Sequence, residues 1–363
     1  MKDKIVPILL VGGGTGGHIT PLIAVAEGLT SRSIPFLFVG SRGGPEEELV
    51  GKNYPYKAIY AGKWRRYFTP SSFGKNLVDL VKIKIGFWQS LWLIWKTGAR
   101  VVFCKGGYVA VPVVIAAWIL RRKVIVHESD AVMGVANRFA SHFASKVLTA
   151  FDPMIYPNHD QRYTQVGIPI RNSLRQAATL KSPKKSRSLV LIMPGSQGST
   201  AINQHLAAVL PELLIQSDVV HMTGKDDYQK FQRLYEQLAP GQKSHYKVFA
   251  YIDRELPYYF QAADLIIGRA SATTVAEAAL FAKPIFLIPL PGAATDHQTK
   301  NASRLFEAEA AWIQDQANLT DKSFIQQISG ILGDPEEAKK RGENLRKYFN
   351  TQDSLDRIIS ELT

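Results

Sequence analysis

Cysteine, long apolar runs and metal-ligand spacings are all scarce in this chain. Its 363 residues include one cysteine, Cys104, so no intramolecular disulfide can form and a reducing, cytoplasmic setting is indicated. The longest uninterrupted apolar run, residues 109–120, contains Pro112 and is shorter than the roughly 18–20 residues of a membrane span. The sequence has no Asp-x-Asp pair and no His/Cys cluster with metal-ligand spacing, which disfavours a metal-dependent transferase.

Negative charge is scarce in the first half. Residues 1–168 hold 21 Lys and Arg against 10 Asp and Glu, whereas residues 169–363 hold 23 against 21. Most of the formal net charge of +13 therefore belongs to the first half. Three anionic partners fit this imbalance, namely a nucleic acid, an acidic membrane surface or a pyrophosphate-bearing substrate.

Two glycine-rich loops, each directly after an apolar strand, are the most informative positive feature. The strand expected at 5–11 leads into Gly-Gly-Gly-Thr-Gly-Gly-His at 12–18, and the strand at 189–193 leads into Pro-Gly-Ser-Gln-Gly at 194–198. A buried strand that turns through glycines into a helix leaves backbone N–H groups where a phosphate can bind. Two such turns predict two Rossmann-like α/β domains facing a cleft.

Short apolar strands alternate with helical segments in both halves, which predicts parallel sheets covered on both faces. The expected strands are 5–11, 36–39, 57–60, 101–104, 123–127 and 146–149 in the first half, and 189–193, 219–222, 247–251, 265–267 and 284–289 in the second. We predict an N-terminal domain at 1–168, a C-terminal domain at 169–335, and a helical tract at 336–363 that packs back on the first domain.

The first loop matches the dinucleotide fingerprint at Gly12, Gly14 and Gly17, but a dehydrogenase also needs an acid at the end of its second strand. Here that strand runs into Gly40, and the nearest acids, 46–48, begin a helix. The sequence thus disfavours a nicotinamide cofactor and remains compatible with a phosphate. His18 stands where the loop becomes a helix, a position that favours neutral imidazole and suits a general base.

Two polar segments follow strands of the second half. In 264–277, Arg269 and a Ser/Thr-rich helix start can hold a diphosphate, and the carboxylate of Glu277 can accept from the two hydroxyls of a ribose. In 288–301, a Pro/Gly loop opens a helix with Asp296, His297, Gln298 and Asn301, which suits hydrogen bonding to a sugar.

Aromatic and basic residues are interleaved at 63–68 and 82–96. Trp88, Trp92 and Trp95 recur at helical spacing among lysines. Such a stripe is either part of a buried core or an interfacial helix on anionic lipid, and the sequence leaves both readings open.

Taken together, these motifs resemble the MurG family of peptidoglycan glycosyltransferases. The matching segments extend from the first glycine loop to the last polar helix start, namely 12–21, 105–109, 127–137, 167–171, 195–198, 269–277 and 296–301. The resemblance implies a glycosyltransferase-B fold and an inverting, metal-independent transfer that needs no cofactor. The family moves N-acetylglucosamine from UDP-N-acetylglucosamine to the 4-hydroxyl of undecaprenyl-pyrophosphoryl-N-acetylmuramyl-peptide (lipid I), giving lipid II and UDP.

The resemblance also implies where this occurs and with which partners. We expect a peripheral protein on the cytoplasmic face of the bacterial membrane that binds the sugar nucleotide, the acceptor lipid and an anionic membrane surface, and no nucleic acid. Other cell-wall synthesis proteins are further expected partners, and peptidoglycan synthesis links the activity to cell shape and division.

Residue roles carried over by motif fall into three groups. His18 is the expected catalytic base. Donor-binding residues are Thr15, Gly16, Gly17, Arg171, Ser196, Gln197, Ile252 (through its backbone), Arg269, Glu277, His297 and Gln298. Acceptor-side residues are Gly14, Tyr108, Glu128, Asp130 and Asn137.

One departure bears on the mechanism. Ser129-Asp130 stands where many members have Gln-Asn, which makes Asp130 an alternative base to His18. Three other readings stay open: a nicotinamide-dependent oxidoreductase, a catalytically silent lipid-binding relative, and a UDP-N-acetylglucosamine epimerase of the same fold. The epimerase would leave the basic, Trp-rich first half unexplained.

Overall fold

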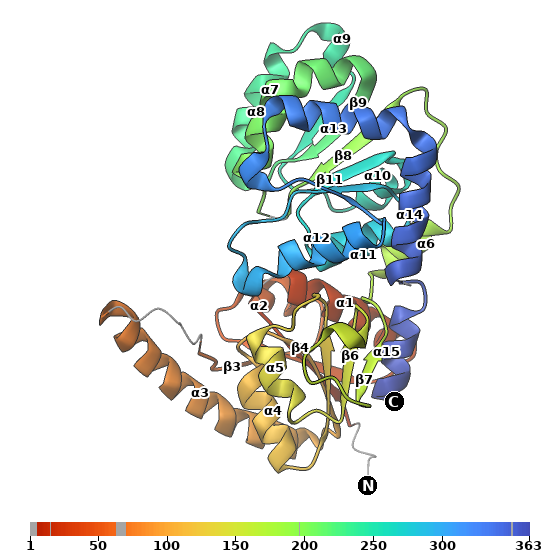
Figure 1. Ribbon diagram of the computed structural model, residues 1–363. Helices are drawn as coiled ribbons and strands as arrows, with labels where there is room; N and C mark the ends of the chain where they lie inside the picture. Colours follow the sequence, from red (N-terminus) through yellow and green to blue (C-terminus); the bar gives the residue numbers. More distant parts are fainter. Residues whose placement is uncertain (1–5, 15, 63–69, 196, 350) are drawn as a thin grey trace. The chain divides into compact units, whose positions relative to one another are not determined.

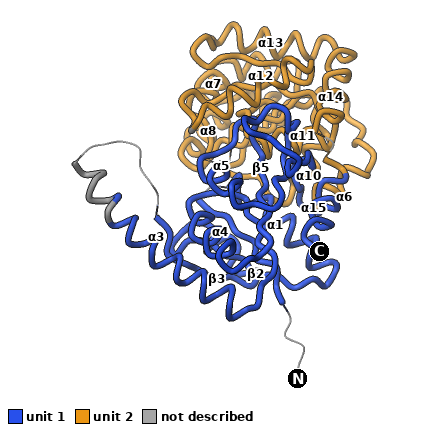
Figure 2. Tube along the Cα trace, turned by 60° about the horizontal axis from the view of Figure 1, so that its bottom comes forward, with its two compact units in different colours: residues 1–172, 353–363 blue, residues 173–352 orange. Residues whose placement is uncertain are grey.

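The structure, a computed structural model, describes residues 6–14, 16–62, 70–195, 197–349 and 351–363 (Figure 1). The chain forms two compact units, residues 1–172 with 353–363 and residues 173–352 (Figure 2). Each unit has its own parallel sheet covered by helices, so the predicted pair of α/β domains is confirmed. The observed units differ from the expected boundaries by assigning the end of the chain to the first unit.

The sheet of the first unit has the strand order β3-β2-β1-β4-β5-β6-β7, with every neighbouring pair parallel. Its strands are β1 (Ile8–Gly12), β2 (Phe36–Ser41), β3 (Tyr56–Ile59), β4 (Val101–Gly106), β5 (Lys123–Glu128), β6 (Lys146–Thr149) and β7 (Tyr163–Gln165). The short edge strand β7 has no apolar alternation and was not predicted. Carboxyl ends of parallel strands share one edge of a sheet, so the loops after β1, β4 and β5 are brought together.

The sheet of the second unit has the order β10-β9-β8-β11-β12-β13 and is also parallel. Its strands are β8 (Ser188–Met193), β9 (Ser217–Met222), β10 (Tyr246–Phe249), β11 (Leu265–Gly268), β12 (Ile285–Leu287) and β13 (Trp312–Ile313). β10 ends two residues earlier than expected, which places Ala250 and Tyr251 in the following loop. The two-residue strand β13 was not predicted.

Helices alternate with these strands (Figure 1). In the first unit they are α1 (Gly16–Ser31), α2 (Pro45–Val50), α3 (Pro70–Thr97), α4 (Ala110–Ile119), α5 (Val135–Ser141) and α15 (Ser354–Leu362). α6 (Asn172–Ala178) begins at the boundary. The second unit has α7 (Thr200–Gln216), α8 (Lys225–Gln237), α9 (Pro240–Lys243), α10 (Leu256–Ala262), α11 (Ala272–Leu280), α12 (His297–Glu307), α13 (Asp321–Gly333) and α14 (Pro335–Phe349). Short 3-10 turns are η1 (Pro153–Ile155), η2 (Ala294–Asp296) and η3 (Gln316–Asn318).

The C-terminal tract is divided between the units, which corrects the expectation that all of it packs on the first. α14 packs on α11 of the second unit, and only α15 packs on α1 of the first. Leu355 and Ile359 of α15 join the core of the first unit. Gly28 allows this approach, because a Cβ there would lie 2.6 Å from Cδ1 of Ile359.

Cys104 lies in β4 and is fully buried. Burial raises the pKa of its thiol to about 12, so the side chain stays a neutral thiol at physiological pH.

Candidate active-site residues

The first glycine loop joins β1 to α1 at the carboxyl edge of the first sheet. Gly14 has a φ of +93°, which L side chains rarely adopt. A Cβ at Gly107, after β4, would lie 2.3 Å from the backbone oxygen of Gly13, so the loops after β1 and β4 approach each other through glycine. His18 is the third residue of α1 and is half-buried.

The carboxylate of Glu46, from α2, lies against this loop. Glu46 is 2 % exposed and accepts hydrogen bonds from the backbone N–H groups of Gly14 (3.2 Å) and Ser41 (2.7 Å). In the sequence it reads only as an acid at a helix start, and its contact with Gly14 joins positions 32 residues apart. The separation of Glu46 and Gly14 along the chain therefore does not predict that Glu46 binds the loop backbone.

A second buried carboxylate organises the turn after β5. Glu128 accepts from the backbone N–H groups of Ser129 (2.8 Å), Asp130 (3.0 Å) and Gly134 (3.0 Å), and from Nδ2 of Asn137 (2.9 Å). These four donors fix the turn that carries Asp130. Glu128 and Asn137 thus shape the expected acceptor side from within the unit.

Lys105 is the penultimate residue of β4 and is 1 % exposed. Its Nζ donates to the hydroxyl of Ser129. Burial lowers the pKa of Lys105, while Glu128 and Asp130 oppose that shift. Burial also raises the pKa of Glu128, and the charge of Asp130 adds to it, while Lys105 opposes the shift. The charges of Lys105, Glu128 and Asp130 therefore influence one another. They lie at or next to positions 129–130, where many family members have Gln-Asn.

His127 is buried behind the same turn. Burial, followed by the charge of Lys105, holds the pKa of His127 well below its ordinary value. The ring is therefore neutral, and Nε2 donates to the carbonyl oxygen of Gly167 at 2.8 Å because a carbonyl only accepts. This arrangement makes His127 a structural link to the residues after β7.

The second glycine loop differs from the first in what lies next to it. A Cβ at Gly198 (φ +83°) would lie 2.1 Å from the backbone oxygen of Thr223, so this glycine permits close packing. A Cβ at Gly195 (φ +113°) would meet none of the described residues within 4 Å. Ser199 then caps α7 by accepting from the N–H of Ile202 at 3.4 Å. Beside Gly195 the described residues leave open space at a capped helix N-terminus.

Arg269 joins three segments of this unit. Nη1 donates to the backbone oxygens of Ile288 (2.9 Å) and Pro289 (3.0 Å), and Nη2 donates to Oγ of Ser199 (2.6 Å) and Oε1 of Gln316 (2.7 Å). These bonds use the four Nη hydrogens of the guanidinium. Burial lowers the pKa of Arg269. The side chain thus holds loops together. From the sequence, Arg269 was expected to contact the diphosphate directly, and this structural role was not expected.

α11 begins in a polar, buried setting. Ser271 caps it by accepting from the N–H of Thr274 at 3.4 Å. Glu277 lies on this helix and is 8 % exposed. The fully buried Asn301 of α12 donates from Nδ2 to the backbone oxygen of Ala270 at 3.0 Å, which ties α12 to the turn before α11.

The loop after β12 is closed by one of the expected sugar-binding residues. Oε1 of Gln298 accepts from the N–H of Leu290 at 2.9 Å. Thr295 and Asp296 both have positive φ, +59° and +55°, which for the β-branched Thr295 is a strained conformation. His297 follows as the first residue of α12.

A buried polar chain supports the second loop and was missed by sequence reasoning. Nε2 of His221 lies 3.0 Å from Oδ1 of Asn203, and Nδ1 lies 3.0 Å from the hydroxyl of Tyr246. Nδ2 of Asn203 donates to the backbone oxygen of Thr223 (2.9 Å) and to Asp227 (2.7 Å). Burial lowers the pKa of His221 to about 3, so the neutral ring donates from Nε2 and accepts at Nδ1.

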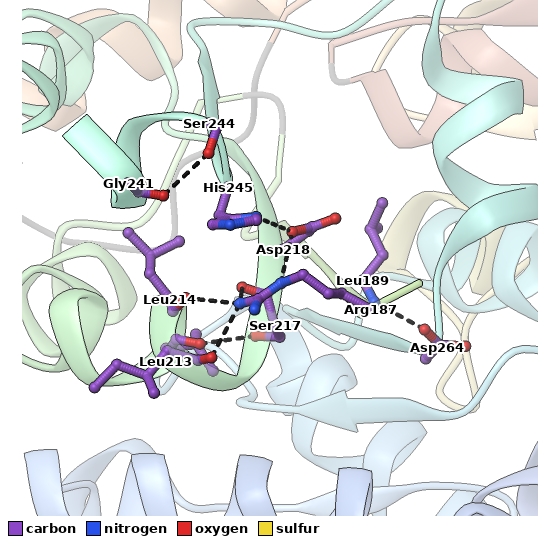
Figure 3. A network of polar contacts seen from close by, with 11 residues as sticks. Arg187, Leu189, Leu213, Leu214, Ser217, Asp218, Gly241, Ser244, His245 and Asp264 are labelled. Carbon is purple, nitrogen blue, oxygen red and sulfur yellow. Dashed lines mark hydrogen bonds and ion pairs between the residues drawn. The ribbon is translucent and has the colours of Figure 1, made fainter. Parts of the chain in front are cut away.

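The opposite, amino edge of this sheet carries the network of Figure 3. Asp218 accepts from Nε of Arg187 at 3.2 Å and lies 2.7 Å from Nδ1 of His245. Nη2 of Arg187 donates to the backbone oxygen of Leu214 at 2.7 Å, near the end of α7. Because ligands of parallel α/β sheets bind at the carboxyl edge, we assign this network to stability.

The tryptophan stripe of α3 is exposed, so the reading as buried core is wrong. Trp88, Trp92 and Trp95 are 68 %, 50 % and 72 % exposed. The buried side of the helix instead carries Ser90 and Ile94, and α3 packs on α4.

Most sequence-predicted residues fall on the carboxyl-edge loops of their own unit, and their roles remain predictions. The described ones are Gly14, Gly16, Gly17, His18, Tyr108, Glu128, Asp130, Asn137 and Arg171 in the first unit, and Gln197, Ile252, Arg269, Glu277, His297 and Gln298 in the second. The side chain of Ile252 is buried. Thr15, Ser196 and residues 63–68 lie outside the described residues.

Among the described residues, no group of three or more His, Cys, Asp and Glu side chains could hold a metal ion. Within that same part of the chain, no helix is both long and apolar enough to cross a membrane.

Curated relatives match nearly the whole chain. A protein of Geobacillus thermodenitrificans is 33 % identical over 351 residues, covering 94 % of both chains. One of Clostridium botulinum is 33 % identical over 359 residues, covering 97 % of this chain and 96 % of its own. Both are named UDP-N-acetylglucosamine–N-acetylmuramyl-(pentapeptide) pyrophosphoryl-undecaprenol N-acetylglucosamine transferase. The crystal structure of Acinetobacter baumannii MurG aligns with a TM-score of 0.77 at 26 % identity, covering 98 % of each chain.

The chain belongs to the MurG family of glycosyltransferases.

Domain profiles agree with this family. The glycosyltransferase family 28 N-terminal domain matches residues 8–149, and its C-terminal domain matches residues 189–358. The glycosyltransferase of kitacinnamycin also aligns over 98 % of this chain with a TM-score of 0.70, but at 14 % identity that likeness concerns the fold alone. The two parallel-sheet domains are those of the glycosyltransferase-B architecture.

Proposed function

We propose that this chain transfers N-acetylglucosamine from UDP-N-acetylglucosamine to the 4-hydroxyl of lipid I, giving lipid II and UDP. The observation that carries the proposal is the match over 94–97 % of the chain, at 33 % identity, to transferases named for these substrates. Through peptidoglycan synthesis the activity serves cell shape and division. A second, nicotinamide-dependent function gains no support, because Glu46 is bound to the glycine loop and no acid ends β2.

The donor is assigned to the second unit. Its glycine loop ends at the N-terminus of α7, where backbone N–H groups favour an anion. Among the described residues, none comes within 4 Å of a Cβ placed at Gly195. Glu277 would accept from the ribose hydroxyls, the backbone at Ile252 would contact uracil, and His297 and Gln298 would contact the sugar. The residues assigned to the diphosphate are Ser196, Gln197 and, through its charge and the loops it holds, Arg269.

The acceptor is assigned to the first unit, beside Gly14, Tyr108, Glu128, Asp130 and Asn137. A base removes the proton of the acceptor hydroxyl, whose oxygen attacks the anomeric carbon in line and expels UDP. His18 is the proposed base and Asp130 the alternative. Helix N-termini stabilise the charge that develops on the leaving diphosphate, and no metal or other cofactor is required.

Membrane docking is assigned to the exposed face of α3. Trp88, Trp92 and Trp95 are at least half exposed. The same helix carries Lys82, Lys84 and Lys96. Nζ of Lys96 lies 4.4 Å from the ring centroid of Trp92. Interfacial aromatics combined with lysines suit the surface of an anionic leaflet. We therefore place the protein peripherally on the cytoplasmic face of the bacterial membrane, where other cell-wall synthesis proteins are candidate partners.

The direct test is incubation with radiolabelled UDP-N-acetylglucosamine and a short-chain lipid I analogue. The expected products are a disaccharide lipid and stoichiometric UDP, with UDP-N-acetylglucosamine strongly preferred over UDP-glucose. Formation of UDP-N-acetylmannosamine without release of UDP would indicate an epimerase. Equal affinity for NADH would indicate an oxidoreductase, and lipid binding without turnover would indicate a silent relative.

A further inference from the structure

Lys105 is a buried lysine with few hydrogen bonds. It is 1 % exposed, and its Nζ donates to Oγ of Ser129, which is buried as well. Among the described residues, this is the one hydrogen bond that the ammonium group makes, although it has three N–H donors. A buried charge is costly unless it is paired. The charge of Lys105 therefore depends on neighbouring charges more than on hydrogen bonds.

The sheet order places Lys105 between two loops of the expected active site. β4 lies between β1 and β5, so the first glycine loop is on one side of Lys105 and the turn after β5 is on the other. A Cβ at Gly12 would lie 3.3 Å from Cβ of Lys105. Ser129, which accepts from Nζ, belongs to the turn after β5. The ammonium group thus reaches the turn that carries Asp130.

Glu128, in the same turn, is ionised according to its hydrogen bonds. A protonated carboxyl would need an acceptor for its proton. Among the described residues, all partners of Glu128 are donors, namely three backbone N–H groups and the side-chain amide of Asn137. Burial and the charge of Asp130 raise the pKa of Glu128, and the charge of Lys105 opposes that rise. Lys105 therefore helps to keep this carboxylate ionised.

Cys104 and His127 are two further titratable groups beside Lys105, and both are neutral. Burial raises the pKa of the Cys104 thiol to about 12. Burial, followed by the charge of Lys105, holds the pKa of His127 well below its ordinary value. Glu128 and Asp130, by contrast, favour the charged form of Lys105 against the effect of burial. Loss of the Lys105 charge would leave these two carboxylates to repel each other in a buried setting.

We infer that Lys105 is a positioning residue whose ammonium group compensates the negative charge that Asp130 brings to the turn after β5, so that Lys105, Ser129 and Asp130 act as one unit. Many family members have a neutral Gln-Asn pair at positions 129–130, and an amide at position 130 would not need this counter-charge. The role of the unit in turnover rests on the proposed function, whereas the charge compensation can be tested by unfolding alone.

The first experiment is a thermal unfolding cycle with Lys105→Met, Asp130→Asn and the double variant. Methionine keeps an unbranched side chain and removes the charge. Lys105→Met alone should lower Tm by about 6–15 °C, because it leaves buried carboxylates without their counter-charge. Together with Asp130→Asn, the same change should cost less than half as much, since the two sites are coupled. Equal Tm losses with and without Asp130→Asn would overturn the inference, because a packing role does not depend on Asp130.

The second experiment measures transfer by the same variants. Lys105→Met should lower kcat/KM for lipid I about 10- to 100-fold, and KM for UDP-N-acetylglucosamine should change less than about 2-fold. Lys57→Met is the matched control, because Lys57 is an exposed lysine of β3 in the same sheet; it should leave Tm and activity unchanged. Equal losses on the donor and acceptor sides would contradict a role at the turn after β5.

Ser129→Ala provides the test if Lys105→Met does not fold. It removes the hydrogen-bond acceptor of Lys105 and keeps every charge. Tm should fall by a few degrees, and kcat/KM for lipid I should fall about 3- to 10-fold, the size expected for one hydrogen bond. An unchanged Tm and activity in Ser129→Ala would overturn the inference. A wild type without transferase activity would refute the proposed function, and the Tm measurements would still decide the role of Lys105.

Discussion

Arg269 and Ser199 lie 70 positions apart, yet Nη2 of the arginine donates to Oγ of the serine at 2.6 Å. Ser199 is the residue that caps α7. A buried cation is therefore coupled to the N-terminus of the helix that follows the second glycine loop. The remaining Nη hydrogens of Arg269 connect that helix to the loops after β12 and β13.

This coupling predicts the effect of Arg269→Lys. A lysine keeps the charge but cannot reach four acceptors in a planar fork. We expect the free energy of unfolding to fall by roughly 2–4 kcal/mol and KM for UDP-N-acetylglucosamine to rise more than KM for lipid I. Denaturant unfolding and steady-state kinetics provide the measurement. Arg304→Lys, at an exposed ion pair, is the control. Equal losses of stability and equal changes in KM in the two variants would contradict the role of Arg269 in holding the loops together.

Replacement of the proposed base should affect the chemical step. His18→Ala is expected to lower kcat by roughly 10²–10⁴-fold and to leave donor binding nearly unchanged, as measured by UDP titration. Asp130→Asn introduces the residue that many family members carry and should be mild if His18 is the base. A larger loss for Asp130→Asn than for His18→Ala would move the assignment to Asp130.

Metal removal should not affect turnover. The sequence has no Asp-x-Asp pair, and helix N-termini supply positive potential for the leaving diphosphate. We expect the initial rate in EDTA to equal the rate in Mg²⁺. Activity that disappears in EDTA and returns with Mg²⁺ or Mn²⁺ would contradict this prediction.

The tryptophans of α3 should contribute to membrane affinity without contributing to folding. Because Trp88, Trp92 and Trp95 are exposed, their joint replacement by serine should shift Tm by only a few degrees and reduce sedimentation with anionic vesicles. Salt should weaken the remaining binding. Phe306→Ser, at an exposed aromatic of the second unit, is the control. Equal binding of the wild type to neutral vesicles would remove the electrostatic part of the argument.

Stability should decrease in mild acid because of His221. Its pKa is about 3 in the folded chain against about 6.5 in an unfolded one. Between these values the unfolded state binds one more proton than the folded state, so stability is present above pH 6.5 and is lost as the pH falls. The contribution of His221 changes by about 1.4 kcal/mol per pH unit below 6. His221→Gln should make the dependence of unfolding free energy on pH shallower by that amount between pH 6 and 5, and an unchanged slope would contradict the assignment.

Local information determined much of this protein. Apolar strands, glycine turns and helical periodicity are properties of neighbouring residues, so the two parallel-sheet domains and the loops that carry the expected site could be predicted from the sequence. Strand ends and the very short strands β7 and β13 could not be predicted. A strand of two or three residues is too short to show a periodic pattern, so tertiary pairing decides whether it joins a sheet.

Only the tertiary structure decided what surrounds those loops. Glu46 at the first loop, Arg269 at the cap of α7, and the chain from Tyr246 through His221 to Asn203 all join residues far apart in the sequence. The same holds for the direction of the tryptophan stripe and for the division of the C-terminal tract between two units. Helical spacing places residues on one face of a helix but does not say whether that face meets core or solvent. Likewise, a carboxylate or guanidinium has no recognisable role until folding determines which buried donors and acceptors it must satisfy.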